Sequence, residues 1–134
     1  MFIQGVGTDI IEIQRIAKII DKFGNRFLYR VYSEDEILYA ENKKGFFAAS
    51  LAARFAAKEA VMKALGTGVS GARFKEIEIT SQKGRPGVLL KGMTKKRADS
   101  LLVKCIHLSL SHCGEYALAF AVAEREVSNE AGDC

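Results

Sequence analysis

The amino-acid sequence predicts an α+β fold in which an antiparallel sheet packs against one long, alanine-rich helix. Phe46–Leu65 carries small or apolar residues around most of a helical circumference and is followed by Gly66, as expected for a buried helix that ends at a glycine. In Tyr116–Glu124 alanine alternates with larger residues, so one face of a strand there would carry only alanine. Such a face accepts a helix at close range, and we expect these two surfaces to pack together.

Hydrophobic periodicity and turn residues define the other elements. A Ser33-x-x-Glu36 capping box marks the start of a helix that runs to about Asn42. The segment before it, Arg26–Tyr32, is predicted to be a short turn. The remaining predicted helices run from about Ile10 to Gly24 and from Thr94 to about Val103, and the remaining predicted strands are Phe2–Gly7, Lys75–Thr80, Val88–Lys91 and Ile106–Ser111, with Ser81–Gly87 as a hairpin loop.

Length and composition limit what the chain can be. Its 134 residues fit one domain, 1–134, with a frayed tail at about 125–134. The composition is 49% hydrophobic and 27% charged, which argues against a disordered chain. The net charge of +4 suits an acidic substrate or partner without requiring nucleic acid.

The sequence also predicts a cytoplasmic location. The N-terminal segment has an early acidic residue and no basic region, unlike a signal peptide, and no apolar run is long enough to cross a membrane. Cys105, Cys113 and Cys134 are an odd number of cysteines without paired spacing, so we expect free thiols in a reducing compartment. No CxxC motif occurs, and His107 and His112 are spaced as in a strand, which argues against a zinc site.

Asp9 follows Gly5-x-Gly7 at the end of the first predicted strand, a common position for a loop that faces a ligand. Two interpretations stay open. Asp9 could cap the first helix through an Asp9-x-x-Glu12 pattern, or it could bind a cation. A hard cation such as Mg²⁺ needs only one or two carboxylates when phosphate oxygens and water complete its octahedron.

The long helix carries four charges on a mostly apolar surface, at Arg54, Lys58, Glu59 and Lys63. Buried charges are costly unless they are paired or bound to something. Glu59 and Lys63 could form an i,i+4 salt bridge on a solvated stripe. The following Gly66-Thr67-Gly68 segment lets a ligand approach the backbone closely, which favours a binding site. Glu59 is therefore a plausible partner of Asp9 at a cation, although spacing alone cannot bring the two together.

Two further features are candidate contact sites. The first predicted helix and the segment after it carry a basic stripe with interleaved apolar residues: Arg15, Lys18, Ile19, Lys22, Phe23, Arg26, Phe27 and Arg30. A basic stripe is usually a solvated face, and docking of an acidic helix is the second interpretation. His112 follows a strand with His107, Ser109 and Ser111 on one face, but no nucleophile–base pair is visible, and His112 could be a surface residue.

Four motifs occur in the order and spacing of a known family. They are GVGTDIIE at 5–12, RFAAKEA at 54–60, KALGTG at 63–68 and SLSH at 109–112. Through them the chain closely resembles the holo-[acyl-carrier-protein] synthases, the short bacterial-type branch of the 4′-phosphopantetheinyl transferases. The resemblance extends from the N-terminus to about Glu124, and the first two motifs together are highly specific.

The resemblance implies a Mg²⁺-dependent transferase of fatty acid biosynthesis, which moves 4′-phosphopantetheine from coenzyme A to a serine of apo-acyl carrier protein. Asp9 and Glu59 match the Mg²⁺ ligands of this family, and Lys63 matches a lysine that contacts the phosphates. The segments that line the coenzyme A site contain Lys58, Gly66, Gly68, Pro86 and His112.

The resemblance also implies partners. The family usually assembles as a homotrimer with active sites between subunits, and its basic first helix docks the acidic carrier protein. The corresponding docking residues here are Arg15, Ile19, Lys22, Arg26, Phe27 and Arg30.

Thr8 and Cys113 depart from the residues usual in the family at those positions. The proton of the carrier serine could go to Glu59 or to a metal-activated water.

A small basic nucleic-acid-binding module is the alternative function, because aromatic residues lie between arginines in Arg26–Arg30. It lacks RNP, KH and helix-turn-helix signatures and leaves a buried Glu59 unexplained.

Overall fold

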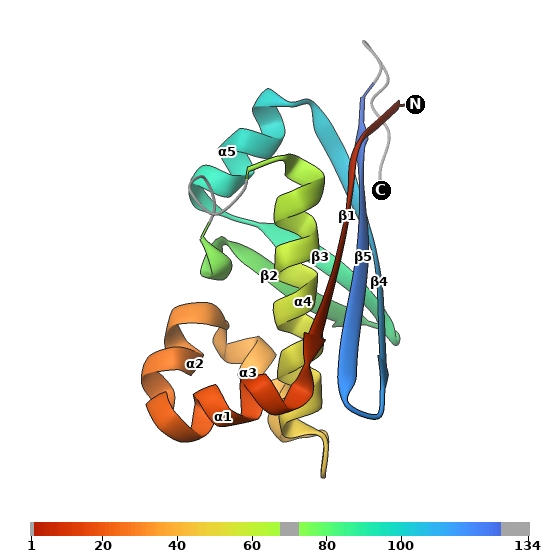
Figure 1. Ribbon diagram of the computed structural model, residues 1–134. Helices are drawn as coiled ribbons and strands as arrows, with labels where there is room; N and C mark the ends of the chain where they lie inside the picture. Colours follow the sequence, from red (N-terminus) through yellow and green to blue (C-terminus); the bar gives the residue numbers. More distant parts are fainter. Residues whose placement is uncertain (1, 68–72, 127–134) are drawn as a thin grey trace.

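The computed structural model describes residues 2–67 and 73–126 as a mixed fold of helices and antiparallel strands (Figure 1). The strands are β1 (Phe2–Glu12), β2 (Ile77–Gln82), β3 (Arg85–Leu90), β4 (Val103–Cys113) and β5 (Tyr116–Arg125). The helices are α1 (Ile13–Phe23), α2 (Asn25–Val31), α3 (Glu34–Glu41), α4 (Phe47–Leu65) and α5 (Gly92–Ser100), with a 3₁₀ turn at Phe74–Glu76. The predicted α+β class with an antiparallel sheet is confirmed.

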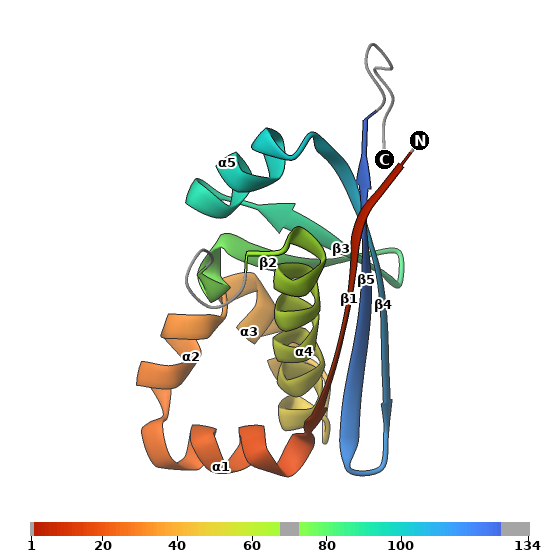
Figure 2. The same ribbon diagram turned by 45° about the horizontal axis from the view of Figure 1, so that its top comes forward.

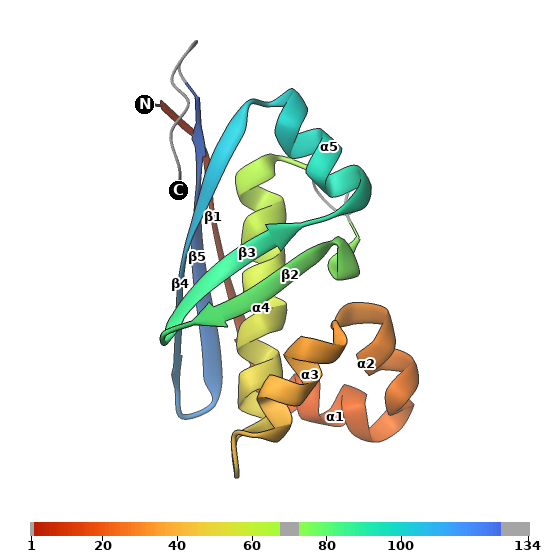
Figure 3. The ribbon, with the colours of Figure 1, turned by 180° about the vertical axis from the view of Figure 1, so that it is seen from behind.

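The long helix α4 is the centre of the fold. β1, β5 and β4 form an antiparallel sheet in that order, and α4 packs along it against β1 and β5. β2 and β3 form a separate hairpin that crosses α4 at an angle and contacts β4 through β3 (Figure 3). The three short helices α1, α2 and α3 gather at one end of α4 (Figure 2).

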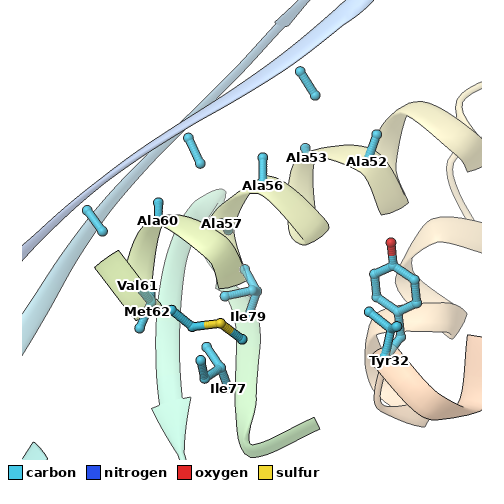
Figure 4. Packing of buried hydrophobic residues seen from close by; sticks show 14 of the residues in the cluster. Tyr32, Ala52, Ala53, Ala56, Ala57, Ala60, Val61, Met62, Ile77 and Ile79 are labelled. Carbon is cyan, nitrogen blue, oxygen red and sulfur yellow. The ribbon is translucent and has the colours of Figure 1, made fainter. Parts of the chain in front are cut away.

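Small residues bring α4 unusually close to the sheet. The four alanines of β5 at positions 117, 119, 121 and 123 are fully buried, as the alternation predicts. Figure 4 shows Ala53, Ala56 and Ala60 on the side of α4 that faces the strands. On the β1 side, a Cβ added to Gly7 would lie 1.9 Å from the carbonyl oxygen of Ala60, so only glycine fits there. The predicted packing of the alanine faces is therefore confirmed.

Two N-terminal elements differ from the prediction. β1 does not end at Gly7 but continues to Glu12, because its last residues pair with the start of β5, where Glu12 lies opposite Tyr116. The residues predicted to be a turn form the helix α2 after a break at Gly24, which has a φ of 55°. Pairing partners more than 100 residues away and packing against the core decide these segments, and local periodicity does not report either.

The later elements differ mainly in their boundaries. The capping box is present: the Ser33 hydroxyl accepts from the Glu36 N–H, and the Glu36 carboxylate accepts from the Ser33 N–H. The β2–β3 loop is shorter than predicted, because Lys83 and Gly84 both adopt positive φ in a tight turn. Thr94 is not the N-cap of α5 but lies inside its first turn, where it hydrogen-bonds Glu76.

The remaining expectations have mixed outcomes. Cys113 is a free, exposed thiol, but Cys105 is disulfide-bonded, so the expectation of free thiols is wrong for that residue. Within residues 2–67 and 73–126, no helix is long and apolar enough to span a membrane. Arg125 belongs to β5, and most of the tail predicted to be frayed lies outside the described residues.

Candidate active site

The Asp9 side chain lies beside Lys63 of α4. It lies inside β1, opposite Ala119, so it does not cap α1. The Lys63 ammonium donates to the Thr8 carbonyl oxygen at 2.8 Å and lies 3.4 Å from Oδ1 of Asp9. Among the described residues no ion pair joins Glu59 to Lys63, so the i,i+4 salt-bridge interpretation is not supported.

Glu59 belongs to the same group of charges. Partial burial raises its pKa, the carboxylate of Asp9 raises it further, and the Lys63 ammonium opposes both effects. The two carboxylates are therefore close enough to repel each other. A divalent cation would relieve this repulsion, and side-chain oxygens are the ligands that Mg²⁺ prefers. The Asp9 side chain is 21% exposed, so a cation and its water ligands could reach it from solvent.

A second feature is a cleft of about 430 Å³ on another side of α4. It lies between α3, α4, the β2–β3 turn and the end of β4. Pro86 and His112, both predicted to bind the cofactor, are in its wall. The other lining residues are Tyr39, Lys43, Phe46, Ser50, Ala53, Arg54, Ser81, Gly84 and Leu108–Ser111.

Arg54 is the most unusual residue of this cleft. It is only 5% exposed, and its guanidinium stacks on the Tyr39 ring at 3.9 Å. Nη1 donates to the Ser50 hydroxyl at 3.3 Å. Its Nε is the one buried side-chain nitrogen or oxygen of the described residues that has no hydrogen-bond partner. An arginine that lines the same cleft as Lys43 and His112 is suited to binding an anion such as phosphate.

Arg54, Lys43 and Tyr39 were not among the predicted site residues. The signal for Arg54 was available, because it is a charge on an apolar helix, as Glu59 is. Lys43 and Tyr39 give no such signal in the sequence, since they reach the cleft only through the packing of α3 on α4.

Asp9 and Glu59 are called the acid pair below. Within one chain, the acid pair and the cleft lie on opposite sides of α4. At about 100° per residue, side chains nine positions apart point in opposite directions. Glu59 is nine residues after Ser50, and Lys63 is nine residues after Arg54. The sheet repeats this separation, since Asp9 is on the edge strand β1 and His112 is on the opposite edge strand β4.

Lys58 has a different position from the one predicted. Its ammonium is fully buried and lies 2.9 Å from Oε1 of Glu36. It also donates to the carbonyl oxygens of Phe74 and Ile77. An ammonium has three N–H donors, and all three are used here. We therefore correct the predicted cofactor contact of Lys58 to a structural role, which ties α3, α4 and β2 together.

Of the two predicted glycines, Gly66 belongs to the described residues. Gly66 is exposed and ends α4 in a left-handed conformation with a φ of 70°, at the same end of the helix as Lys63 and away from the cleft. Gly68 lies outside the described residues.

The basic stripe is exposed on α1 and α2, and β1 leads directly into it. Arg15 and Lys22 of α1 and Arg26 and Arg30 of α2 are exposed. The two apolar members, Ile19 and Phe27, are half-buried, and Phe27 makes an edge contact with Tyr32 at 5.9 Å between ring centroids. Because α1 begins four residues after Asp9, a protein bound to the stripe would lie close to the acid pair.

Comparisons with known proteins identify the family of the chain. The sequence model of the 4′-phosphopantetheinyl transferase superfamily matches residues 5–121. A holo-[acyl-carrier-protein] synthase from Halothermothrix orenii is 45% identical over 123 residues, which cover 91% of this chain and 98% of the relative. One from Ruminiclostridium cellulolyticum is 50% identical over 119 residues, covering 87% and 89%.

Solved structures show the same fold. The holo-[acyl-carrier-protein] synthase of Neisseria meningitidis superimposes with a TM-score of 0.84 at 37% identity, over 92% of this chain and 100% of the other. The Helicobacter pylori enzyme, in complex with coenzyme A, gives a TM-score of 0.78 at 33% identity, over 89% and 99%.

Proposed function

The chain belongs to the holo-[acyl-carrier-protein] synthase family, and we propose that it transfers 4′-phosphopantetheine from coenzyme A to a serine of apo-acyl carrier protein. The products are holo-acyl carrier protein, for fatty acid biosynthesis, and adenosine 3′,5′-bisphosphate. One observation carries the proposal. The chain combines two neighbouring carboxylates, Asp9 and Glu59, which could bind a cation, with a cleft lined by basic residues, which could bind an anion. The nucleic-acid alternative has no comparable support.

We place the adenosine bisphosphate end of coenzyme A in the cleft. The Arg54 guanidinium, with Lys43 and His112, supplies positive or hydrogen-bonding groups for phosphate oxygens. The Phe46 ring, whose centroid is 6.2 Å from that of His112, adds an apolar wall on which a base could pack.

We place the reacting phosphate at the acid pair. Asp9 and Glu59 would hold Mg²⁺, which when bound supplies positive charge to the phosphate oxygens. Lys63 would contact the same phosphates. The serine oxygen of the carrier forms a bond to the phosphorus next to pantetheine, and the bond from that phosphorus to the departing adenosine bisphosphate oxygen breaks. Glu59 or a metal-activated water would accept the serine proton.

The separation of the two halves supports a site shared between copies. A single chain holds the cleft and the acid pair on opposite sides of α4, so one coenzyme A can join them only across a subunit interface. An interface between two different surfaces of the same chain closes into a ring when the rotation between neighbouring copies closes. The outer face of the sheet offers apolar area for such contacts, since Val6, Ile10, Leu118 and Phe120 are exposed. With the family resemblance, we propose a homotrimer.

The proposed docking partner is acyl carrier protein. Its acidic helix would lie on the stripe of Arg15, Ile19, Lys22, Arg26, Phe27 and Arg30. The cytoplasmic location stays a prediction from the sequence.

The test is mass spectrometry of apo-acyl carrier protein incubated with coenzyme A, Mg²⁺ and the enzyme. We expect the carrier to gain one phosphopantetheine, and Asp9→Asn and Arg54→Met each to slow the gain. Light scattering measures the assembly in the same preparation. No gain of mass would contradict the proposed reaction, and a fully active monomer would contradict the shared site.

A further inference from the structure

We propose that the Lys63 ammonium holds the Asp9 carboxylate in the metal-free protein and leaves it when a divalent cation binds. Cation binding would thereby free Lys63 to contact the phosphates of the substrate. This inference deepens the proposed function and rests on its metal site.

The contact geometry is the first argument. Lys63 Nζ lies 2.8 Å from the Thr8 carbonyl oxygen and 3.4 Å from Oδ1 of Asp9. The Lys63 ammonium therefore contacts two oxygens from consecutive residues of β1. An ammonium and a divalent metal ion both seek such oxygens, and a metal bound at the Asp9 carboxylate would repel an ammonium at this distance.

The mobility of the side chain is the second argument. Lys63 lies in the last turn of α4, and its side chain is 54% exposed. Its flexible four-carbon stem can rotate into solvent without disturbing the helix. Lys58, the other lysine of α4, cannot move in this way, because it is fully buried and fully hydrogen-bonded. The Lys63 side chain can therefore change its position, whereas the Lys58 side chain is fixed.

The third argument concerns free energy. An ion pair as exposed as this one contributes little, so a metal ion can displace it at small cost. The displacement nevertheless opposes metal binding. Removal of the Lys63 ammonium should therefore tighten metal binding about two- to fivefold in the absence of coenzyme A, the factor that corresponds to one exposed ion pair.

The experiment measures Mn²⁺ binding to the full chain by the loss of the free-ion electron paramagnetic resonance signal, without coenzyme A. Lys63→Met is expected to bind Mn²⁺ about two- to fivefold more tightly than wild type. The matched control is Lys95→Met, which removes the same charge from an ion pair of similar exposure, since Lys95 is 55% exposed and 2.6 Å from Asp99. This control should leave the affinity unchanged, which separates direct contact from a general charge effect.

A second measurement follows Lys63 itself. Acylation of lysines by a water-soluble reagent, read by mass spectrometry, should become faster at Lys63 when Mn²⁺ is added, with Lys22 as the internal reference. Mn²⁺ binding that depends on Asp9, with no change in Lys63→Met and no change in Lys63 reactivity, would overturn the inference and leave the proposed function standing. Binding that is absent, or that survives in Asp9→Asn, would overturn the metal site and the inference together.

Discussion

Gly7 of β1 lies directly on the carbonyl group of Ala60 in α4, where an added Cβ would come within 1.9 Å of the oxygen. Gly7 is two residues before Asp9, and Ala60 follows Glu59. The close approach of the two backbones therefore sets how near the two carboxylates lie. Gly5 makes the same kind of contact one helical turn further along, at Ala64. The site depends on the absence of two side chains.

Gly7→Ala is expected to destabilise the fold and to reduce transfer activity. The new methyl group has to push β1 away from α4, and overpacking of this kind costs about 1–3 kcal/mol. Urea denaturation measures the stability, and Mn²⁺ binding reports the carboxylate geometry. Gly114→Ala is the control, because a Cβ there meets no atom within 4 Å and introduces only the strain of a φ of 58°. If both variants bind Mn²⁺ like wild type, the close approach does not position the acid pair.

Lys58→Met is expected to lower the free energy of unfolding by about 3–5 kcal/mol, because it leaves the buried Glu36 carboxylate without its cation. The double variant Lys58→Met/Glu36→Gln should lose less, since the amide can still accept a hydrogen bond and no charge stays buried. Urea denaturation of both variants measures the difference. A Lys58→Met protein of normal stability that binds coenzyme A weakly would restore the predicted cofactor role of this lysine.

Local sequence predicted most of the fold because its main contacts have local signatures. The alternating alanines of β5 and the capping box at Ser33 could be interpreted without knowing any partner. The extension of β1 to Glu12 could not, because it depends on pairing with Tyr116 at the far end of the chain. The helix α2 could not be predicted for a similar reason, since Leu28 and Val31 become helical core residues only when α1 and the Phe74–Glu76 turn pack beside α2.

The candidate site divides in the same way. Asp9, Glu59 and Lys63 were named from motifs, and the structure brings them together. The cleft was missed except for Pro86 and His112, because the sequence does not reveal that Arg54 keeps an unpaired donor. Spacing also cannot reveal that the two halves lie on opposite sides of α4.

Glu76 is expected to support α5 in a pH-dependent way. Its carboxylate accepts hydrogen bonds from the Thr94 hydroxyl and from the backbone N–H groups of Met93 and Thr94. Partial burial alone would raise its pKa, but these hydrogen bonds outweigh burial and lower it below its usual value of 4.5. A carboxyl with a lowered folded-state pKa stabilises the fold above its unfolded-state pKa, and this stability is lost as the pH falls through the folded-state pKa.

The measurement compares the melting temperature of wild type and Glu76→Gln from pH 7 to pH 3. Wild type should melt higher at pH 7, by the equivalent of about 1 kcal/mol for a helix-capping interaction, and the gap should close below about pH 4.5. Lys95→Met, which breaks an exposed pair within α5, should show little change at any pH. A gap that is constant across this range would exclude ionised Glu76 as the source of the stability.

Glu59→Gln is expected to keep the fold and to lose transfer activity by about a hundredfold or more, because one charge of the proposed cation site is gone. The raised pKa of Glu59 means that its ionisation destabilises the fold. The stability from the protonated form is present at low pH and is lost as the pH rises through the folded-state pKa. Without metal, Glu59→Gln should therefore melt no lower than wild type at pH 8, with any advantage shrinking toward pH 4. Near-normal activity at saturating Mg²⁺ would remove Glu59 from the metal site.

Arg26→Glu is expected to weaken binding of acyl carrier protein without changing coenzyme A affinity. Arg26 is exposed on α2. The cleft lies between α3, α4, the β2–β3 turn and the end of β4, so the two binding events can be separated. Exposed charges at the edge of an interface mainly set the association rate and its salt dependence. The apparent KM for the carrier should rise about tenfold or more, because a charge reversal replaces attraction of the acidic helix by repulsion.

Steady-state kinetics with varied carrier protein, beside calorimetry with coenzyme A, measures the two effects for Arg26→Glu. Arg97→Glu on α5 is the matched control, since it makes the same charge change at another exposed position. The wild-type rate at low carrier concentration should also fall as salt rises, because exposed charges are screened over about 8–10 Å at physiological ionic strength. If coenzyme A binding collapses in Arg26→Glu while the carrier KM stays constant, the stripe belongs to the cofactor site. If Arg97→Glu raises the carrier KM equally, the effect comes from net charge, and α1 and α2 are not the docking face.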